Sequence, residues 1–273
     1  LYCPSCPNPC YEMFNNTNIQ TAVNGYGANS IYRGDFWAGY LGQKGGYNSY
    51  AFQGVSPSAS GNGWDFQFIR RINIMLSHLE DGVLSTEEVS HWKSVGLFFH
   101  SYWYMELISR FGDVPWVDEI ITDSSEERFM ARTPRDEVAS NILERLIWAE
   151  ENIGSSDKDG DNPVTRDCIR VLLSRFGLRE GTWRKYHGLG DAEKYLQACI
   201  KYSELLMADY PTLYQGVAKN DKGEPVPGAG YGELWTTRDL AGVPGVIFFK
   251  RIVGEVNPHR FSDYEHIAAH NYE

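Results

Sequence analysis

STEEVSHWKSVGLFFHSYWYMELISRFGDVPWV, residues 85–117, is the stretch that decides how this chain folds. Ser85 is followed three residues later by Glu88, a capping-box pattern that predicts the start of a helix. From Val95 to Phe111 apolar residues fall on almost every side of that helix. A surface helix carries one apolar stripe, so this run predicts a helix that is packed between other elements.

The same stretch also indicates where the helix ends and what it is not. Gly112 suits a left-handed stop, and Pro115 prevents the helix from resuming. Polar residues interrupt the apolar run at His100, Glu106 and Arg110, and the run is too short to span a membrane.

Apolar residues recur every three or four positions on both sides of this helix and predict helices at 64–81, 133–153, 165–187 and 191–209. Thr133 is expected to cap the second of these, with Pro134 in its first turn. We expect Asn73 to be buried and to bond a neighbouring backbone.

The last two helices are expected to form an antiparallel pair. Gly177 and Gly181 would let the partner helix approach closely, and Cys168 and Cys199 are predicted to be small core residues. The apolar side chains expected to pack in this pair are Ile169, Leu172, Leu173, Phe176, Leu178, Trp183, Tyr195, Tyr202, Leu205 and Leu206.

Before the helices lies a segment, 24–63, rich in Gly, Asn, Ser and aromatic residues. The glycines predict surface loops, and an aromatic ring on a surface loop can stack on the apolar face of a sugar. The residues predicted to bind ligand are Trp37, Tyr40, Tyr47 and Tyr50 by stacking, and Asp35 and Asn48 by hydrogen bonds. The alternative, that the rings fold back onto the helices, stays open for each one.

After the helices, residues 210–243 are rich in Gly and Pro and predict loops, while 245–253, GVIFFKRIV, predicts a short strand. Tyr231 and Trp235 in the loops are further candidate ligand-binding residues.

The composition and the motifs exclude several functions. The formal net charge of −11 argues against nucleic acid, which requires a basic footprint. No nucleotide-binding or hydrolase motif occurs, so no catalytic residue is predicted. A pair of acidic residues for glycoside hydrolysis cannot be picked out from the sequence.

Three patterns resemble metal sites, and none is complete. Cys3, Cys6 and Cys10 lack a fourth ligand and are read as a loose terminus with at most one disulfide. Asp157, Asp159 and Asp161 alternate as in a calcium loop, but Asn162 and Cys168 replace the required Gly and Glu. His266 and His270 lack a third ligand. We therefore expect no metal and no cofactor.

The central helix resembles the signature helix of the SusD/RagB family through Tyr102, Glu106–Leu107 and Arg110–Pro115. Trp64 and Asn73 match the family's preceding helix, whereas His91–Lys93 stands near the place of the usual Glu-Ala-Arg. The resemblance implies a mainly α fold of degenerate tetratricopeptide-like helical pairs, with long loops and a short β element. It also implies a non-catalytic, nutrient-binding lipoprotein on the outer membrane of Bacteroidetes.

We therefore expect a loop-rich aromatic segment at 1–63, a helical scaffold at 64–209, and a loop-rich segment with a short strand at 210–273. The resemblance implies that the protein binds a glycan or another nutrient oligomer and passes it to a SusC-like TonB-dependent transporter. Two alternatives are a helical scaffold that binds only proteins and a helical glycosidase. The terminus at Leu1 reads as a cut edge, and the chain reads as the amino-terminal part of a longer protein, with any lipid anchor upstream.

Overall fold

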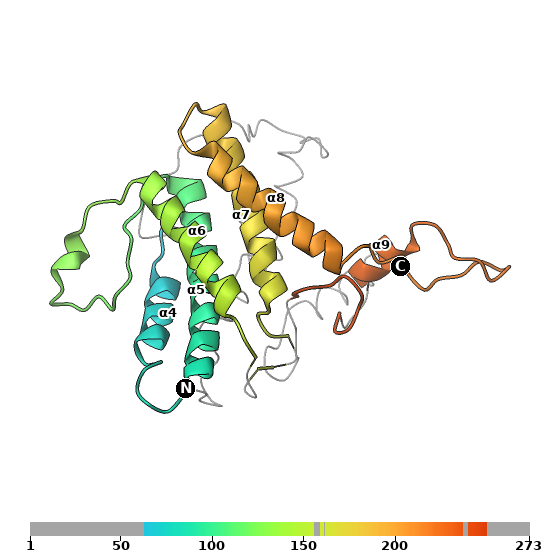
Figure 1. Ribbon diagram of the computed structural model, residues 1–273, viewed down its shortest axis with the longest axis horizontal. Helices are drawn as coiled ribbons and strands as arrows, with labels where there is room; N and C mark the ends of the chain where they lie inside the picture. The colour runs from blue at the N-terminus through green and yellow to red at the C-terminus, as the bar shows by residue number, and fades with distance from the viewer. Residues whose placement is uncertain (1–62, 156–158, 161, 237–239, 250–273) are drawn as a thin grey trace, which may run out of the picture. The chain divides into compact units, whose positions relative to one another are not determined.

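The structure, a computed structural model, describes residues 63–155, 159–160, 162–236 and 240–249, of which Asp65–Phe249 belong to one compact unit. The described part is mainly α-helical, as predicted (Figure 1). Its helices are α4 (Gln67–Ser77), α5 (Thr86–Phe111), α6 (Arg135–Asn152), α7 (Arg166–Tyr186), α8 (Ala192–Asp209) and α9 (Ala229–Thr236), with a 3-10 helix, η2, at Glu126–Phe129.

Helix α5 is the centre of this arrangement and contacts α4, α6 and α7. The predicted capping box is present: the Glu88 amide donates to Ser85 Oγ at 3.2 Å, and the Ser85 amide donates to Glu88 Oε2 at 3.0 Å. Because neighbours cover several sides of the helix, its buried residues include Val95, Phe99 and Ile108. Gly112 ends the helix at φ 71° and ψ −111°, a backbone conformation that favours glycine.

The segment that leaves α5 is held by the start of α6. Val114 and Thr133 form an antiparallel bridge, and the Thr133 hydroxyl accepts a hydrogen bond from the Trp116 amide. The predicted capping role of Thr133 is therefore wrong. Pro134 occupies the cap position of α6, and Asp113 Oδ1 accepts from the Arg135 amide at 2.8 Å in its place.

Asn73 ties α4 to the same segment, as predicted. Its side-chain amide donates to the carbonyl oxygens of Val117 and Glu119 at 3.0 and 3.1 Å, and only 3% of the residue is exposed. The hydrogen bonds join residues more than 40 positions apart in the sequence, so Asn73 has the structural role that its burial requires.

Helices α7 and α8 form the predicted close pair. A Cβ added to Gly177 would lie 2.5 Å from the Tyr195 carbonyl oxygen, and one added to Gly181 would lie 2.8 Å from the Leu196 side chain. Only a residue without Cβ permits this approach. Tyr195 and Tyr202 are buried against α7, and Cys168 is buried at its start, whereas Cys199 is only half-buried.

One prediction about packing and one about secondary structure differ from the structure. Leu178 and Trp183 are 54% and 44% exposed, because the buried face of α7 is formed by Phe176, Gly177, Glu180 and Arg184 instead. The strand predicted from residue 245 is absent from 246–249, which have no regular structure. Among the described residues, 246–249 form no β-bridge, and the rest of the predicted strand, 250–253, lies outside them. The Ile247 carbonyl accepts from the Cys168 thiol at 3.8 Å, and Phe248 packs edge-on against Phe98.

Within the described residues, we find no helix that combines the length and the hydropathy needed to cross a membrane.

Candidate ligand-binding site

Most of the residues predicted to bind ligand lie outside the described part of the chain. These are Asp35, Trp37, Tyr40, Tyr47, Asn48 and Tyr50, and the Cys3–Cys6–Cys10 cluster and the pair His266 and His270 lie outside it as well. Trp235 belongs to α9, but its side chain is outside the description. Tyr231 is therefore the predicted residue whose surroundings are visible, and the site is built from it.

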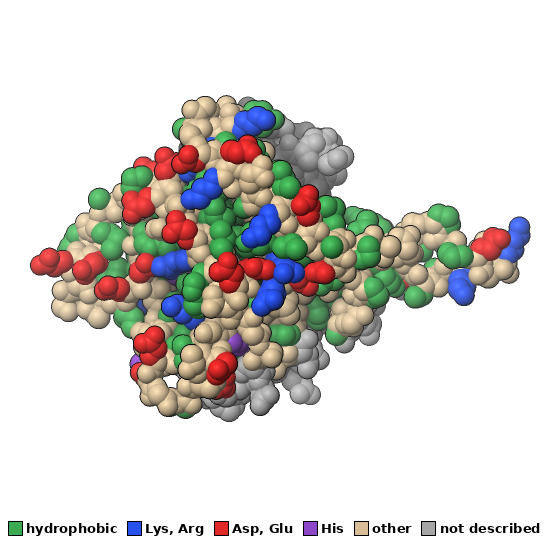
Figure 2. Space-filling view, in the orientation of Figure 1, with side chains coloured by type: hydrophobic (Ala, Val, Ile, Leu, Met, Phe, Trp, Pro, Cys, Tyr) green, Lys and Arg blue, Asp and Glu red, His purple; other side chains and the backbone are tan. Residues whose placement is uncertain are grey.

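Tyr231 lines a cavity of about 450 Å³ at the carboxy end of α8. It is 73% exposed, so it lies at the rim rather than in the core. The walls come from the end of α8, the segment that follows it, α9, and the segment before Phe249. The lining residues are Leu206, Met207, Tyr210, Thr212, Leu213, Tyr214, Tyr231, Leu234, Pro244, Gly245, Val246 and Ile247. Apolar side chains gather in this region of the surface, whereas charged side chains of both signs are interspersed over the helices (Figure 2).

One wall of the cavity is fixed by Glu233 of α9. Its carboxylate accepts hydrogen bonds from the backbone amides of Val217 and Ala218 and from the Tyr214 hydroxyl, the last at 2.9 Å. The two amide hydrogen bonds, together with the Tyr214 hydroxyl, hold the pKa of Glu233 below its ordinary value, and the same contact with Glu233 raises the pKa of Tyr214.

Glycine allows this wall to close against α9. A Cβ on Gly230 would lie 2.4 Å from the Tyr214 carbonyl oxygen, and one on Gly216 would lie 2.6 Å from the Gly230 amide nitrogen. The helix and the loop therefore meet backbone to backbone, which holds Tyr214 at a fixed position beside the cavity.

Another part of the lining is fixed by Tyr210, directly after α8. Its hydroxyl donates to Asp167 Oδ2 of α7 at 2.8 Å, and Asp167 and Asp209 also pair with the Arg170 guanidinium. Burial, followed by the hydrogen bond to Asp167, raises the pKa of Tyr210 to about 12. The Tyr210 hydroxyl thus stays protonated, and its hydrogen bond to Asp167 holds the ring in place.

Sequence reasoning missed Tyr210 and the cavity itself. Tyr210 directly follows a periodic helix, so it reads as the last residue of that helix. The lining residues come from three separate stretches between 206 and 247, and no local pattern joins them. The one available signal was the density of tyrosines at 210, 214 and 231 in a segment otherwise rich in Gly and Pro.

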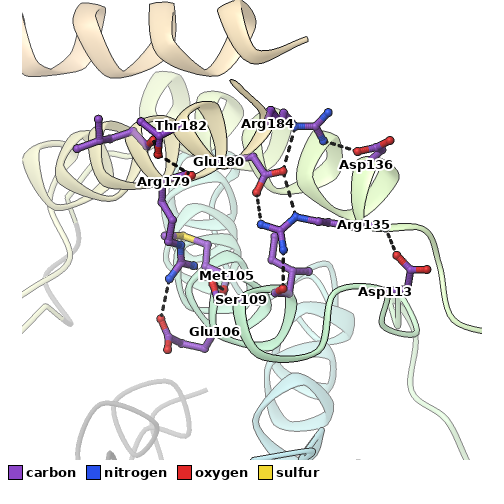
Figure 3. Close-up of polar contacts among 12 residues, drawn as sticks. Met105, Glu106, Ser109, Asp113, Arg135, Asp136, Arg179, Glu180, Thr182 and Arg184 are labelled. Atoms are coloured by element: carbon purple, nitrogen blue, oxygen red, sulfur yellow. Dashed lines mark hydrogen bonds and ion pairs between the residues drawn. The ribbon is translucent and has the colours of Figure 1, made fainter. Parts of the chain in front are cut away.

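Among the described helices, buried polar residues form one cluster around Glu180 and another around His100, and both clusters support the scaffold. In the first, Glu180 accepts from Arg135 at 2.6 Å and from Arg184 at 3.0 Å, while Arg135 also donates to the Ile108 carbonyl at 2.8 Å (Figure 3). Arg184 extends to Asp136 of α6 at 2.7 Å. The carboxylate thus joins α5, α6 and α7, and its charge is compensated by two guanidinium groups.

The second group surrounds His100 of α5, which is fully buried. Its Nε2 meets the Val117 carbonyl and its Nδ1 meets Arg145, each at 3.3 Å. Desolvation by burial, followed by the charge of Arg145, lowers the pKa of His100 to about 3. A neutral imidazole that donates to the Val117 carbonyl and accepts from Arg145 is a structural contact, because with this lowered pKa it does not change its protonation state near neutral pH.

The structure gives no support to a metal site in the part of the chain that it describes, where no three His, Cys, Asp or Glu side chains converge. Asp159, a member of the alternating acidic loop, instead meets buried His91 at 3.0 Å. Asp157 and Asp161 are outside the described residues.

Comparison with known proteins identifies SusD-like relatives. Residues 46–176 match the model of the SusD-like family described as "Starch-binding associating with outer membrane". A curated protein of Formosa agariphila, SusD-like protein P2, is 35% identical over 158 residues, which are 55% of this chain and 30% of that protein. The chain thus spans less than a third of the length of this relative.

Solved structures resemble the chain at lower identity. A laminarin-binding SusD-like protein is 21% identical over 64% of this chain and 34% of its own, with a TM-score of 0.46. Surface glycan-binding protein A from Bacteroides fluxus is 14% identical over 71% and 37%, with a TM-score of 0.48.

Proposed function

We propose, because the chain belongs to the SusD-like family through residues 46–176, that it is part of a non-catalytic protein that captures a glycan at the bacterial outer membrane. The captured glycan would then pass to a SusC-like TonB-dependent transporter. A lipid upstream of Leu1 would attach the protein to the membrane.

The family match carries this proposal, and it confirms the resemblance found in the signature helix. The description of the matched family joins starch binding to the outer membrane. Because the chain spans only part of its curated relative, the ligand and the transporter remain part of the proposal.

The described helices suit a supporting role in such a protein. Glu180 pairs with two guanidinium groups, and His100 contacts a backbone carbonyl and Arg145, so these buried groups are committed to joining helices. Ligand contacts would come from loops carried by this scaffold, which is where aromatic residues are abundant in the sequence.

We propose that Trp37, Tyr40, Tyr47 and Tyr50 stack on the sugar rings, and that Asp35 and Asn48 bond the hydroxyl groups. Stacking of a ring on an aromatic side chain contributes about 1–3 kcal/mol at comparable sites. A site with two or three such contacts binds with a dissociation constant of roughly micromolar or weaker once the cost of association is included. Weak binding suits a protein that hands its ligand on.

Isothermal titration calorimetry with a panel of polysaccharides and peptides tests the proposal, using the present chain, the full-length protein and the variant Trp37→Ala of each. The control is Tyr186→Ala, which removes an aromatic ring that is 82% exposed on the scaffold. We expect one glycan to bind, with a loss of about tenfold or more in Trp37→Ala and no change in Tyr186→Ala.

If only peptides bind, the protein-scaffold alternative replaces this proposal. If both variants bind the glycan as the unsubstituted protein does, the assignment to the amino-terminal loops is wrong.

A further inference from the structure

The cavity at the end of α8 has a chemistry that differs from a typical sugar site. A sugar presents hydroxyl groups on most of its edges, and binding them requires charged, amide or other polar groups around the ring. None of the described residues that line this cavity is charged or carries a side-chain amide. Thr212 and the tyrosines are the lining residues with polar side chains.

Two of these tyrosines have already used their hydroxyl protons. Tyr210 donates to Asp167 at 2.8 Å, and Tyr214 donates to Glu233 at 2.9 Å. Neither hydroxyl can therefore donate to a sugar without breaking a bond to a carboxylate. With their hydroxyls anchored, the two residues are held in place and contribute aromatic surface to the cavity.

The remaining walls are apolar and adaptable. Leu206, Leu213, Leu234 and Val246 supply branched aliphatic side chains, and Met207 supplies a flexible thioether. A thioether makes favourable contacts with aromatic rings and adjusts to irregular shapes. Because the described lining carries no cation, an anionic ligand would gain no ion pair from it.

From this chemistry we propose that the cavity binds a neutral aromatic group, and that in the function proposed above this group is an aryl substituent carried by the captured glycan. The volume of about 450 Å³ is within the range of small-molecule sites, roughly 300–1,000 Å³. A cavity of about 150 Å³ already holds one benzene ring, so a substituted ring with its linkage fits. The sugar itself would stay outside, where Tyr231 lies at the rim.

The test compares two ligands that share a sugar and differ in the aryl group, 4-nitrophenyl β-D-glucoside and methyl β-D-glucoside. Saturation-transfer NMR and titration calorimetry on the present chain would measure binding of each. We expect the nitrophenyl compound to bind at least about tenfold more tightly than the methyl compound, with its ring protons closest to the protein.

Met207→Asp, matched with Ile200→Asp, locates the site. Both residues lie on α8 and are about half to two-thirds exposed, at 62% and 49%, but only Met207 lines the cavity. We expect Met207→Asp to weaken the aryl compound at least about tenfold and Ile200→Asp to leave it unchanged, because a carboxylate in the cavity must be desolvated by the ligand. Tyr231→Ala, a change at the exposed rim, should weaken binding by a smaller factor.

Three results would overturn the inference. These are no binding of the aryl compound, equal binding of the two glucosides, and aryl binding that both Asp variants retain. Each differs from failure of the proposed function, because a polysaccharide without aryl groups would still bind through the amino-terminal loops and be lost in Trp37→Ala.

Discussion

The neutral state of His100 predicts a loss of stability in mild acid. In the folded protein the imidazole is buried between the Val117 carbonyl and Arg145, and its pKa is about 3. In the unfolded chain the same group has its ordinary pKa of 6.5. Below pH 6.5 the unfolded state therefore binds a proton that the folded state does not, and the folded state becomes less stable as the pH falls.

The size of the effect follows from the difference in proton binding. Between pH 6.5 and pH 3 each pH unit removes about 1.36 kcal/mol from the free energy of unfolding. Lowering the pH from 7 to 5 should thus cost about 2 kcal/mol through His100 alone. This figure depends little on the folded pKa, as long as that pKa lies well below 5.

Urea unfolding followed by circular dichroism at pH 7 and pH 5 measures the effect, with His100→Gln as the comparison. Glutamine keeps a polar amide but does not titrate, so the variant's free energy of unfolding should fall by about 2 kcal/mol less than that of the unsubstituted chain over this interval. Any cost of the substitution itself appears at both pH values and cancels.

Equal pH dependence in the two proteins would refute the reasoning. If His100→Gln does not fold, the chemical shifts of the His100 ring in the unsubstituted protein give the same answer. They should report a neutral imidazole at pH 5, and a protonated ring at that pH would contradict the account.

Two further predictions concern the contacts between helices. Gly177→Val should lower the free energy of unfolding by about 1–3 kcal/mol or more, measured by urea unfolding, because the new side chain meets the Tyr195 carbonyl oxygen across the α7–α8 contact. Glu180→Gln should cost about 3–5 kcal/mol and lower the midpoint of thermal unfolding, because Arg135 and Arg184 lose the buried carboxylate that compensates their charges.

Each of these changes has a control on the same scaffold. The atoms nearest to a Cβ on Gly96 belong to the Leu76 and Met75 side chains, which can move, and not to backbone, so Gly96→Ala should change stability much less than Gly177→Val. Glu151 is exposed, and Glu151→Gln should stay within about 0.5 kcal/mol of the unsubstituted protein. If a variant and its control changed stability equally, the helix contact assigned to Gly177 or to Glu180 would be wrong.

Local patterns were sufficient for the parts of the fold that local chemistry determines. The capping box joins Ser85 to Glu88, only three positions later, so the sequence alone locates the start of α5. The small residues Gly177 and Gly181 predict a close helix pair because only glycine leaves room for one. Asn73 could be given a structural role because a polar side chain on an apolar face must find a partner.

The errors arose where a distant partner decides the structure. Residues 246–249 are strongly β-prone, but a strand requires a second strand, and here their carbonyls and rings meet side chains of α5 and α7. Trp183 was expected to pack in the α7–α8 pair, whereas its ring is partly exposed and its centroid lies 4.8 Å from the guanidinium carbon of Arg135. The candidate cavity depends on the same kind of long-range placement, since Glu233 and Asp167 orient its tyrosines from other helices.

Electrophoresis in native gels that contain single polysaccharides tests the central claim most directly, with both the present chain and the full-length protein. The account predicts that at least one glycan retards the full-length protein and that its sugar composition does not change during incubation. Unchanged mobility in every glycan, or release of shorter sugars from the one that binds, would contradict a protein that captures glycans without cleaving them.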